Sequence, residues 1–316
     1  MITEPRIFYK PFEYQTAFEY YKNQHRAHWL ADEIPLASDL NDWKLKLTES
    51  EKNLTGNILK SFAQTEVHVN DYWSTKVSIW FPKPEIQAMA RAFADFESIH
   101  AEAYARLNEE LGLDNFQAFL EDEASKAKIE RLIEVPGESL EEKALSLAIF
   151  SAFTEGVNLF SSFAVLMSFQ LRNLMKGTAQ IVEWSVRDES LHSQAGCWLF
   201  RTLLQEQPHL DTNSMRDKVI EACHLSVQLE FDFIDKAFEM GNIEGLTKEQ
   251  LKNYIKARAN EKMVELGYKA IYNDIDPNLL KQIQWFGHLT SGKTHQDFFA
   301  QRPTNYSKST ADWSDL

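Results

Sequence analysis

Residues 94–107, ADFESIHAEAYARL, decide the fold of this chain. Spacings of three and four residues predict a helix that carries Glu97, His100 and Tyr104 along one side. The other positions of that side are apolar, namely Ile86, Met89, Phe93, Leu107 and Leu111. An acid, an imidazole and a phenol therefore point toward the expected core, where polar groups need a specific partner.

The composition is that of a globular protein. With 316 residues and 44% hydrophobic content, the chain can bury one large core or two smaller ones. Its 33 Lys and Arg against 47 Asp and Glu give a formal charge of -14, so we expect neither nucleic acid nor a membrane surface as a partner. Cys197 and Cys223 lie in apolar helical patterns, which suits a reducing compartment. The N-terminus lacks an export signal, so we expect a soluble cytoplasmic protein.

Helices are predicted almost throughout, because Gly and Pro fall mainly between periodic segments. Capping boxes predict helix starts at Thr48, Ser139 and Thr247. The expected helices run from Thr48 to the break at Phe81–Pro84, Pro84 to near Gly112, Ser139 to about Asn173, Thr178 to before Pro208, Ser214 to Gly241, and Thr247 to Gly267. These lengths indicate an all-α long-helix bundle. We expect one bundle domain, residues 1–290, and a flexible C-terminal tail, residues 291–316.

Acids interrupt three further apolar stripes in the same way. Glu66 interrupts Leu59, Phe62, Val69, Trp73 and Val77 in the preceding helix. Glu155 interrupts Ala148, Ala152, Leu159, Ser162 and Leu166, and the pair Glu189 and His192 interrupts Ile181, Ser185, Gly196 and Leu199. The order along the chain is therefore Glu, Glu-x-x-His, Glu, Glu-x-x-His.

Four carboxylates buried together need cations, because each desolvated charge costs several kcal/mol. Two divalent metals would supply that charge, and a Glu and a His three residues apart on a helix can reach one ion. This ligand set is typical of di-iron and dimanganese carboxylate bundles. Carboxylate and imidazole donors suit Fe or Mn, whereas a structural zinc site usually includes thiolates.

Glu-x-x-His spacing alone is weak evidence, since it recurs at Glu206/His209 and Glu221/His224. The first copy contains Pro208, which does not suit a helix interior. The second is compatible with a helix, but no stripe with a single Glu precedes it. The metal hypothesis therefore rests on the ordered set of six residues.

Over nearly its whole length the chain resembles the radical-generating small (beta) subunit of class I ribonucleotide reductase, a ferritin-like dinuclear-metal protein. FESIHAEAY at residues 96–104 matches the family's second-ligand helix, and RDESLH at 187–192 matches its Arg-Asp-Glu-x-x-His segment. His28 and Trp29, followed by residues 32–34, resemble the N-terminal stretch that carries the family's relay tryptophan.

This resemblance implies a dinuclear centre of two Fe ions, two Mn ions or one of each. Its implied ligands are Glu66, Glu97, His100, Glu155, Glu189 and His192. It also implies that Tyr104 is the radical residue and that His100, Asp188 and Trp29 form a hydrogen-bonded relay toward the surface. In that family the centre is activated by oxygen or a reduced oxygen species, and the oxidant initiates ribonucleotide reduction in a separate large subunit.

The polar segment 302–316 ends with Trp313 and Leu316. By resemblance, Tyr306 relays the radical across the subunit interface, and the last residues dock the tail on the large subunit. The resemblance also implies a homodimer.

Two positions depart from the usual family pattern. Glu66 stands where most members have Asp, and some subgroups with Glu have manganese-containing centres or keep the oxidant on the metals. Leu159 stands where many relatives have Phe, although Phe163 supplies an aromatic ring nearby. The metal identity and the role of Tyr104, either radical residue or buried hydrogen-bonding phenol, therefore stay open.

Two other functional classes also stay open. Another ferritin-like dimetal oxidase, such as an oxygenase or acyl desaturase, would share the six ligands. A non-enzymatic helical scaffold would bind no stoichiometric metal.

Overall fold

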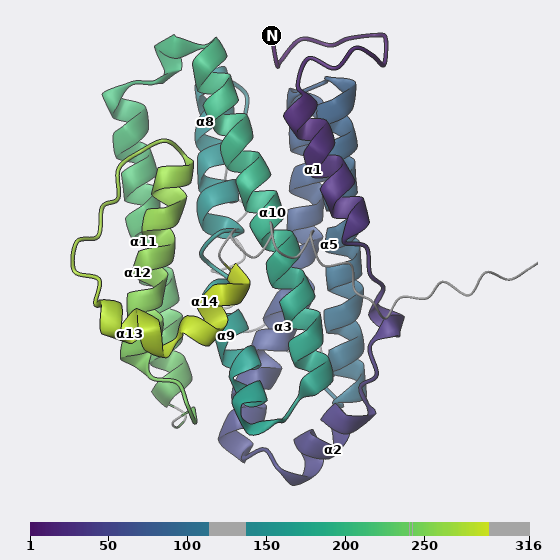
Figure 1. Cartoon of the computed structure of the whole chain (residues 1–316), viewed down its shortest axis with the longest axis vertical. Helices are drawn as coiled ribbons and strands as arrows, with labels where there is room; N and C mark the ends of the chain where they lie inside the picture. The colour runs from purple at the N-terminus through teal and green to yellow at the C-terminus, as the bar shows by residue number, and fades with distance from the viewer. Residues whose placement is uncertain (114–136, 240, 242, 291–316) are drawn as a thin grey trace, which may run out of the picture.

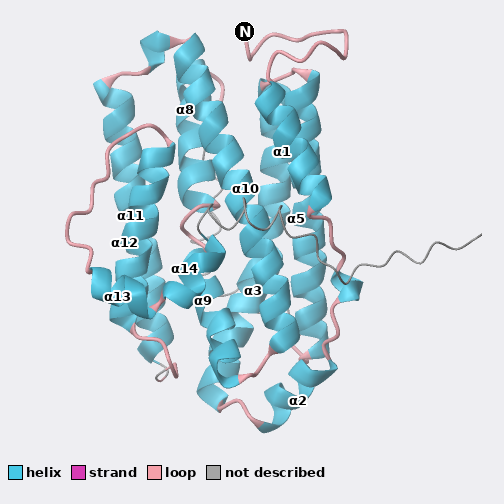
Figure 2. Ribbon diagram, in the orientation of Figure 1, coloured by secondary structure: helices cyan, strands magenta, loops and turns pink. Residues whose placement is uncertain are grey.

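A computed structural model describes residues 1–113, 137–239, 241 and 243–290, and these residues form a bundle of long helices (Figure 1). The helices are α1 (Gln15–Arg26), α2 (Ala37–Leu45), α3 (Glu49–Asp71), α4 (Ser78–Trp80), α5 (Pro84–Glu110), α8 (Leu140–Leu147), α9 (Phe160–Ser168), α10 (Lys176–Glu206), α11 (Asn213–Glu239), α12 (Lys248–Glu265), α13 (Pro277–Gln282) and α14 (Gln284–Thr290). Within the described residues no β-strand forms, and Figure 2 shows helices joined by loops. The predicted all-α class is confirmed.

The predicted helix starts are confirmed in atomic detail. At Thr48, Ser139 and Thr247 the side chain accepts a hydrogen bond from the backbone N–H three residues further on. The Glu or Gln side chain at that later position in turn accepts a hydrogen bond from the backbone N–H of the cap residue. Pro84 occupies the first turn of α5, where its missing N–H costs nothing. Local sequence signals therefore place these helix ends correctly.

Long helices surround a common interior. α3 packs along α5, and α10 packs against α9 and the segment between α8 and α9 (Figure 1). α1 lies against α5 and α10, while α11 and α12 pair on the opposite side of the bundle. None of the described helices is long and apolar enough to cross a membrane. α1, α2, α13 and α14 have no counterpart among the six predicted segments.

The prediction of one helix from Ser139 to Asn173 was wrong. α8 passes into a π-helical segment, Ala148–Thr154, and the chain then makes a turn over residues 155–159 before α9 begins. The N–H of Glu155 bonds to Phe150 five residues back, at 3.0 Å, instead of four. No Pro marks this interruption, and the apolar periodicity continues through it. A shorter π-helical segment, Tyr72–Val77, likewise follows α3.

The predicted tail, residues 291–316, lies outside the described residues, and so does Tyr306.

Candidate metal centre

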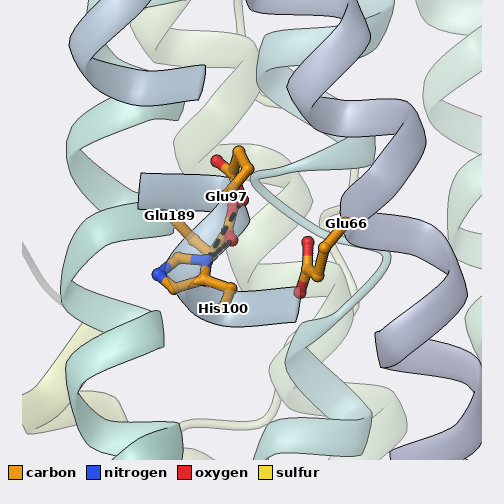
Figure 3. Close-up of side chains that lie close together, drawn as sticks. All are labelled: Glu66, Glu97, His100 and Glu189. Atoms are coloured by element: carbon orange, nitrogen blue, oxygen red, sulfur yellow. Dashed lines mark hydrogen bonds and ion pairs between the residues drawn. The ribbon is translucent and has the colours of Figure 1, made fainter. Parts of the chain in front are cut away.

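The six predicted ligands meet in the interior of the bundle. α3 supplies Glu66, α5 supplies Glu97 and His100, the turn before α9 supplies Glu155, and α10 supplies Glu189 and His192. All six side chains are 0% exposed. Figure 3 shows that four of them, from three helices, converge on one small region. The apolar stripes predicted around these residues are buried as well.

The six residues form two overlapping groups of four, within each of which the ligand atoms lie within 4.8 Å of one another. The first group is Glu66, Glu97, His100 and Glu189, and the second is Glu97, Glu155, Glu189 and His192. Glu97 and Glu189 belong to both groups, so their carboxylates lie between the two positions. Each position also has one histidine and one glutamate of its own.

The two imidazoles point the same kind of nitrogen at the carboxylates. His100 Nδ1 lies 3.1 Å from Glu97 and 3.2 Å from Glu189. His192 Nδ1 lies 2.6 Å from Glu97 Oε1, but the pair is not aligned for a hydrogen bond. The outer nitrogens are held elsewhere, His100 Nε2 by Asp188 at 3.2 Å and His192 Nε2 by Gln24 at 2.9 Å. These outer bonds orient both rings and leave Nδ1 available to an ion.

The carboxylates repel one another in the metal-free protein. Burial raises the pKa of Glu66 and of Glu155 well above the ordinary value, and the charge of Glu189 adds to both shifts. Burial and the charge of Glu97 raise the pKa of Glu189 to about 7. Burial also opposes ionisation of Glu97, but the charges of His192 and His100 lower its pKa to about 2. The site therefore favours added positive charge.

Several ligand atoms have no hydrogen-bond partner among the described residues. They are both oxygens of Glu66, both oxygens of Glu189, one oxygen each of Glu97 and Glu155, and Nδ1 of His192. Buried polar atoms are normally satisfied, and here they converge from four segments of the chain. Two divalent cations would satisfy these atoms and balance the charge, so the donor set fits a dinuclear site.

Trp29, Asp188 and His100 lie in contact with one another. Trp29 Nε1 donates to Asp188 Oδ2 at 2.8 Å, and His100 Nε2 lies 3.2 Å from the same oxygen. Arg187 donates twice to Oδ1 of the aspartate, each time at 3.1 Å. Burial acts to raise the pKa of Asp188, but the charge of Arg187 and the contacts with His100 and Trp29 hold it below the ordinary value. The aspartate therefore remains ionised.

Tyr104 lies one helical turn beyond His100 and is 0% exposed. Its ring packs on Phe62 with the centroids 4.9 Å apart, and Phe62 packs on Phe163 at 5.0 Å. Burial raises the pKa of Tyr104 well above its ordinary value, and the charge of Glu66 adds to the shift. Ser185 approaches the phenol without hydrogen-bond geometry, and the hydroxyl has no hydrogen-bond partner among the described residues.

Sequence reasoning missed two residues that touch the ligands. Gln24 of α1 bonds to His192, and nothing in its local sequence marks it. Trp73 donates its indole N–H to Glu155 Oε1 at 2.6 Å. Its place on the same predicted stripe as Glu66 was the available signal.

The two other Glu-x-x-His pairs lie away from the centre. Glu206 accepts hydrogen bonds from the backbone of Ile2 and from Tyr14, and His209 is exposed. Glu221 and His224 are both exposed. The preference for the ordered set over spacing alone therefore agrees with the fold.

The similarities to known proteins cover most of the chain. The family described as "Ribonucleotide reductase, small chain" matches residues 6–278. The probable ribonucleoside-diphosphate reductase small subunit 048L of Invertebrate iridescent virus 3 is 33% identical over 330 residues, covering 98% of this chain and 86% of the viral protein.

Two solved structures share the fold. The putative class I ribonucleotide reductase from Bacillus halodurans has a TM-score of 0.79 and 23% identity, over 86% of this chain and 99% of that one. The dimanganese(II)-NrdF of Streptococcus sanguinis has a TM-score of 0.76 and 20% identity, over 89% of this chain and 99% of that one. At these identities the likeness concerns the helical architecture.

Proposed function

Because the chain belongs to the ribonucleotide reductase small-chain family, we propose that its six buried ligands hold the dinuclear metal centre with which it serves a separate large subunit. The chain is the small subunit of ribonucleoside-diphosphate reductase, an oxidoreductase with a ferritin-like fold. When bound, two redox-active metal ions supply the one-electron oxidant that initiates ribonucleotide reduction in the large subunit. The observation that carries this proposal is the set of buried ligand atoms that have no hydrogen-bond partner among the described residues.

We assign the ligands to two metal positions according to the two ligand groups. Glu66 and His100 would hold one ion, Glu155 and His192 would hold the other, and Glu97 and Glu189, which belong to both groups, would serve both. Glu66 is one methylene longer than Asp, so its carboxylate would have more rotational freedom when it holds the first ion. Carboxylate and imidazole donors accept both iron and manganese, and we propose either metal, or one of each, for this centre.

We assign the route of electron transfer to His100, Asp188 and Trp29. With Nδ1 of His100 facing the centre, Nε2 carries the proton and donates to Asp188. The indole N–H of Trp29 donates to the same carboxylate oxygen, and its ring stacks on His100 with centroids 5.8 Å apart. One ionised carboxylate thus couples a ligand to an aromatic ring on another segment of the chain.

Tyr104 is the proposed radical residue. It is buried beside the first ligand group, and its apolar surroundings shield the ring from water. Removal of an electron from a phenol releases its proton, and Glu66 is the ligand whose charge acts most strongly on this hydroxyl, ahead of His100 and Glu189.

The remaining proposals concern partners. Family membership requires a large subunit, and we propose that the tail, with Tyr306 and the terminal residues, docks on it and relays the radical. We also propose that two copies of the small subunit form a homodimer in the cytoplasm.

Reconstitution tests the function directly. The purified chain is loaded with Fe(II), Mn(II) or both, exposed to oxygen or a reduced oxygen species, and mixed with its cognate large subunit, a ribonucleoside diphosphate and a dithiol that supplies the two reducing electrons. We expect deoxyribonucleotide only when metal and large subunit are both present. Failure under every loading condition would contradict the proposal, and oxidation of another substrate without the large subunit would favour a different dimetal oxidase.

A further inference from the structure

The chain leaves regular helical geometry immediately after the ligand Glu155. Phe160 N donates to Val157 O at 3.1 Å, although the partner four residues back would be Gly156. Ser161 N donates to a side chain of another helix at 3.3 Å instead of to Val157. Two bonds of the regular ladder are therefore lost at this turn, and the freed backbone groups are buried.

Side chains from the outer helices α11 and α12 replace those bonds. Arg258 of α12 donates Nε to the carbonyl of Gly156 at 2.8 Å. Its guanidinium also lies 4.0 Å from the ring centroid of Phe160, the first residue of α9. Glu230 of α11 accepts hydrogen bonds from the N–H and the hydroxyl of Ser161. Arg258 thus holds both ends of the turn, while Glu230 caps the start of α9.

The backbone at Gly156, directly after Glu155, is closely packed by neighbouring atoms. A Cβ added to Gly156 would lie 2.2 Å from the carbonyl oxygen of Ala152 and 2.8 Å from both Ser193 Oγ and Lys262 Cδ. Ser193 follows the ligand His192 on α10, and Lys262 lies one turn beyond Arg258 on α12. The backbone at Gly156 is therefore confined between the helix that carries His192 and the helix that carries Arg258.

Both polar residues are buried. The side chain of Arg258 is 3% exposed, and its acidic neighbour Glu261, at 3.6 Å, is 58% exposed. Glu230 is 0% exposed. Buried charges need partners within the protein, and the backbone around this turn supplies some of them. Arg258 bonds to the turn after Glu155, and Glu230 bonds to Ser161 just beyond it, so the two residues restrain this segment from both sides.

We propose that Arg258, assisted by Glu230, is a positioning residue for the metal ligand Glu155. By holding the turn it places the Glu155 carboxylate at the second ligand group, and the first group does not depend on it. The inference rests on the proposed dinuclear function. It assigns a role in the metal centre to the outer helices α11 and α12, which supply no ligand.

Titration of the metal-free protein with Mn(II), with free Mn(II) followed by electron paramagnetic resonance, tests this role. We expect the wild type to bind two ions per chain. In Arg258→Met the second ion should bind roughly tenfold or more weakly, because contacts outside the ligands typically change metal affinity by about 10- to 100-fold. The first ion should bind as before. Arg258→Lys retains a donor for the Gly156 carbonyl and should restore part of the affinity.

Arg201→Met is the matched control, because Arg201 also donates to a backbone carbonyl, that of Glu265, outside the turn. It should leave both affinities unchanged. His192→Ala identifies the affected position, since it removes a ligand that belongs to the second group alone. Adding Arg258→Met to His192→Ala should then leave the affinity for the remaining ion unchanged.

The outcomes separate the two claims. A wild type that binds fewer than two ions, both with Mn(II) and in a parallel titration with Fe(II), overturns the proposed centre and this inference with it. The second outcome concerns the inference alone. It is overturned if the wild type binds two ions and Arg258→Met either leaves both affinities unchanged or weakens the first and the second ion equally. Should Arg258→Met fail to fold, Glu230→Gln, which keeps the side-chain volume, is titrated instead, and an unchanged second ion there overturns the role of the turn.

Discussion

The indole of Trp29 donates a 2.8 Å hydrogen bond to Asp188, a residue 159 positions further along the chain. The same carboxylate oxygen lies 3.2 Å from His100, so one acceptor joins an aromatic ring to a proposed metal ligand. Both Trp29 and Asp188 are buried, and this link is therefore screened little by solvent.

Interruption of this link should reduce turnover without lowering the metal content of the centre. In Trp29→Phe the aromatic ring remains and the N–H is lost, so we expect unchanged metal content and a fall in turnover of about tenfold or more. Turnover is measured with saturating large subunit, and metal content by elemental analysis. Trp198→Phe is the control, since that tryptophan packs on Tyr14 and Tyr20 outside the link. Equal losses in both variants would argue against a relay.

Glu97 and Glu189, which belong to both ligand groups, should matter more for metal content than the ligands that belong to one group. Glu97→Gln weakens both ligand groups, so we expect it to bind less than one ion per chain, whereas Glu66→Gln should retain the ion of the second group. Metal content after dialysis, together with the shift in thermal unfolding on metal addition, provides the measurement. Identical stoichiometry in the two variants would contradict the overlapping arrangement.

Tyr104→Phe should remove the phenol without disturbing the pocket. The ring that packs on Phe62 is kept, so metal loading and thermal stability should stay at wild-type levels. We expect loss of the organic radical signal and of turnover, both measured on the activated protein. Tyr72→Phe is the control, because Tyr72 is a second buried tyrosine, stacked on Phe150. Activity retained in Tyr104→Phe would place the oxidant on the metals.

Acid should destabilise the N-terminal junction of the bundle through Glu85. Its carboxylate is 0% exposed and accepts hydrogen bonds from Glu13 N, Tyr14 N and Arg6. Burial acts to raise its pKa, but the backbone N–H groups and Arg6 hold it below the ordinary value of 4.5. A lowered pKa in the folded state means that the stabilisation is present above pH 4.5 and is lost as the pH falls below it.

Glu85→Gln should therefore lower the free energy of unfolding at pH 7 by roughly 3 kcal/mol and flatten its fall in acid. Denaturant unfolding of the metal-free protein at several pH values provides the measurement. Glu49→Gln is the control, because Glu49 is 91% exposed and its pair with Lys52 contributes little. If the free energy of unfolding of Glu85→Gln falls as steeply in acid as that of the wild type, other carboxyl groups dominate the loss of stability at low pH.

Much of the centre follows from local sequence. Glu97, His100, Glu189 and His192 lie on regular helices, where spacing alone decides which side chains share a face. The capping boxes at Thr48 and Ser139 place helix starts through contacts within three residues. The burial of Glu66 follows from its apolar stripe. Such features depend on short-range geometry, which a single sequence displays directly.

Tertiary structure decided the rest. The turn after Glu155 arises from contacts with Arg258 and Glu230, which lie far along the chain, and the apolar periodicity gives no sign of it. Gln24 reaches His192 across 168 positions. The sequence by itself determined which residues could bind metal, because helix periodicity and charge balance are local and additive. Only the packing of distant helices decided how those ligands are oriented, because that depends on where unrelated segments meet.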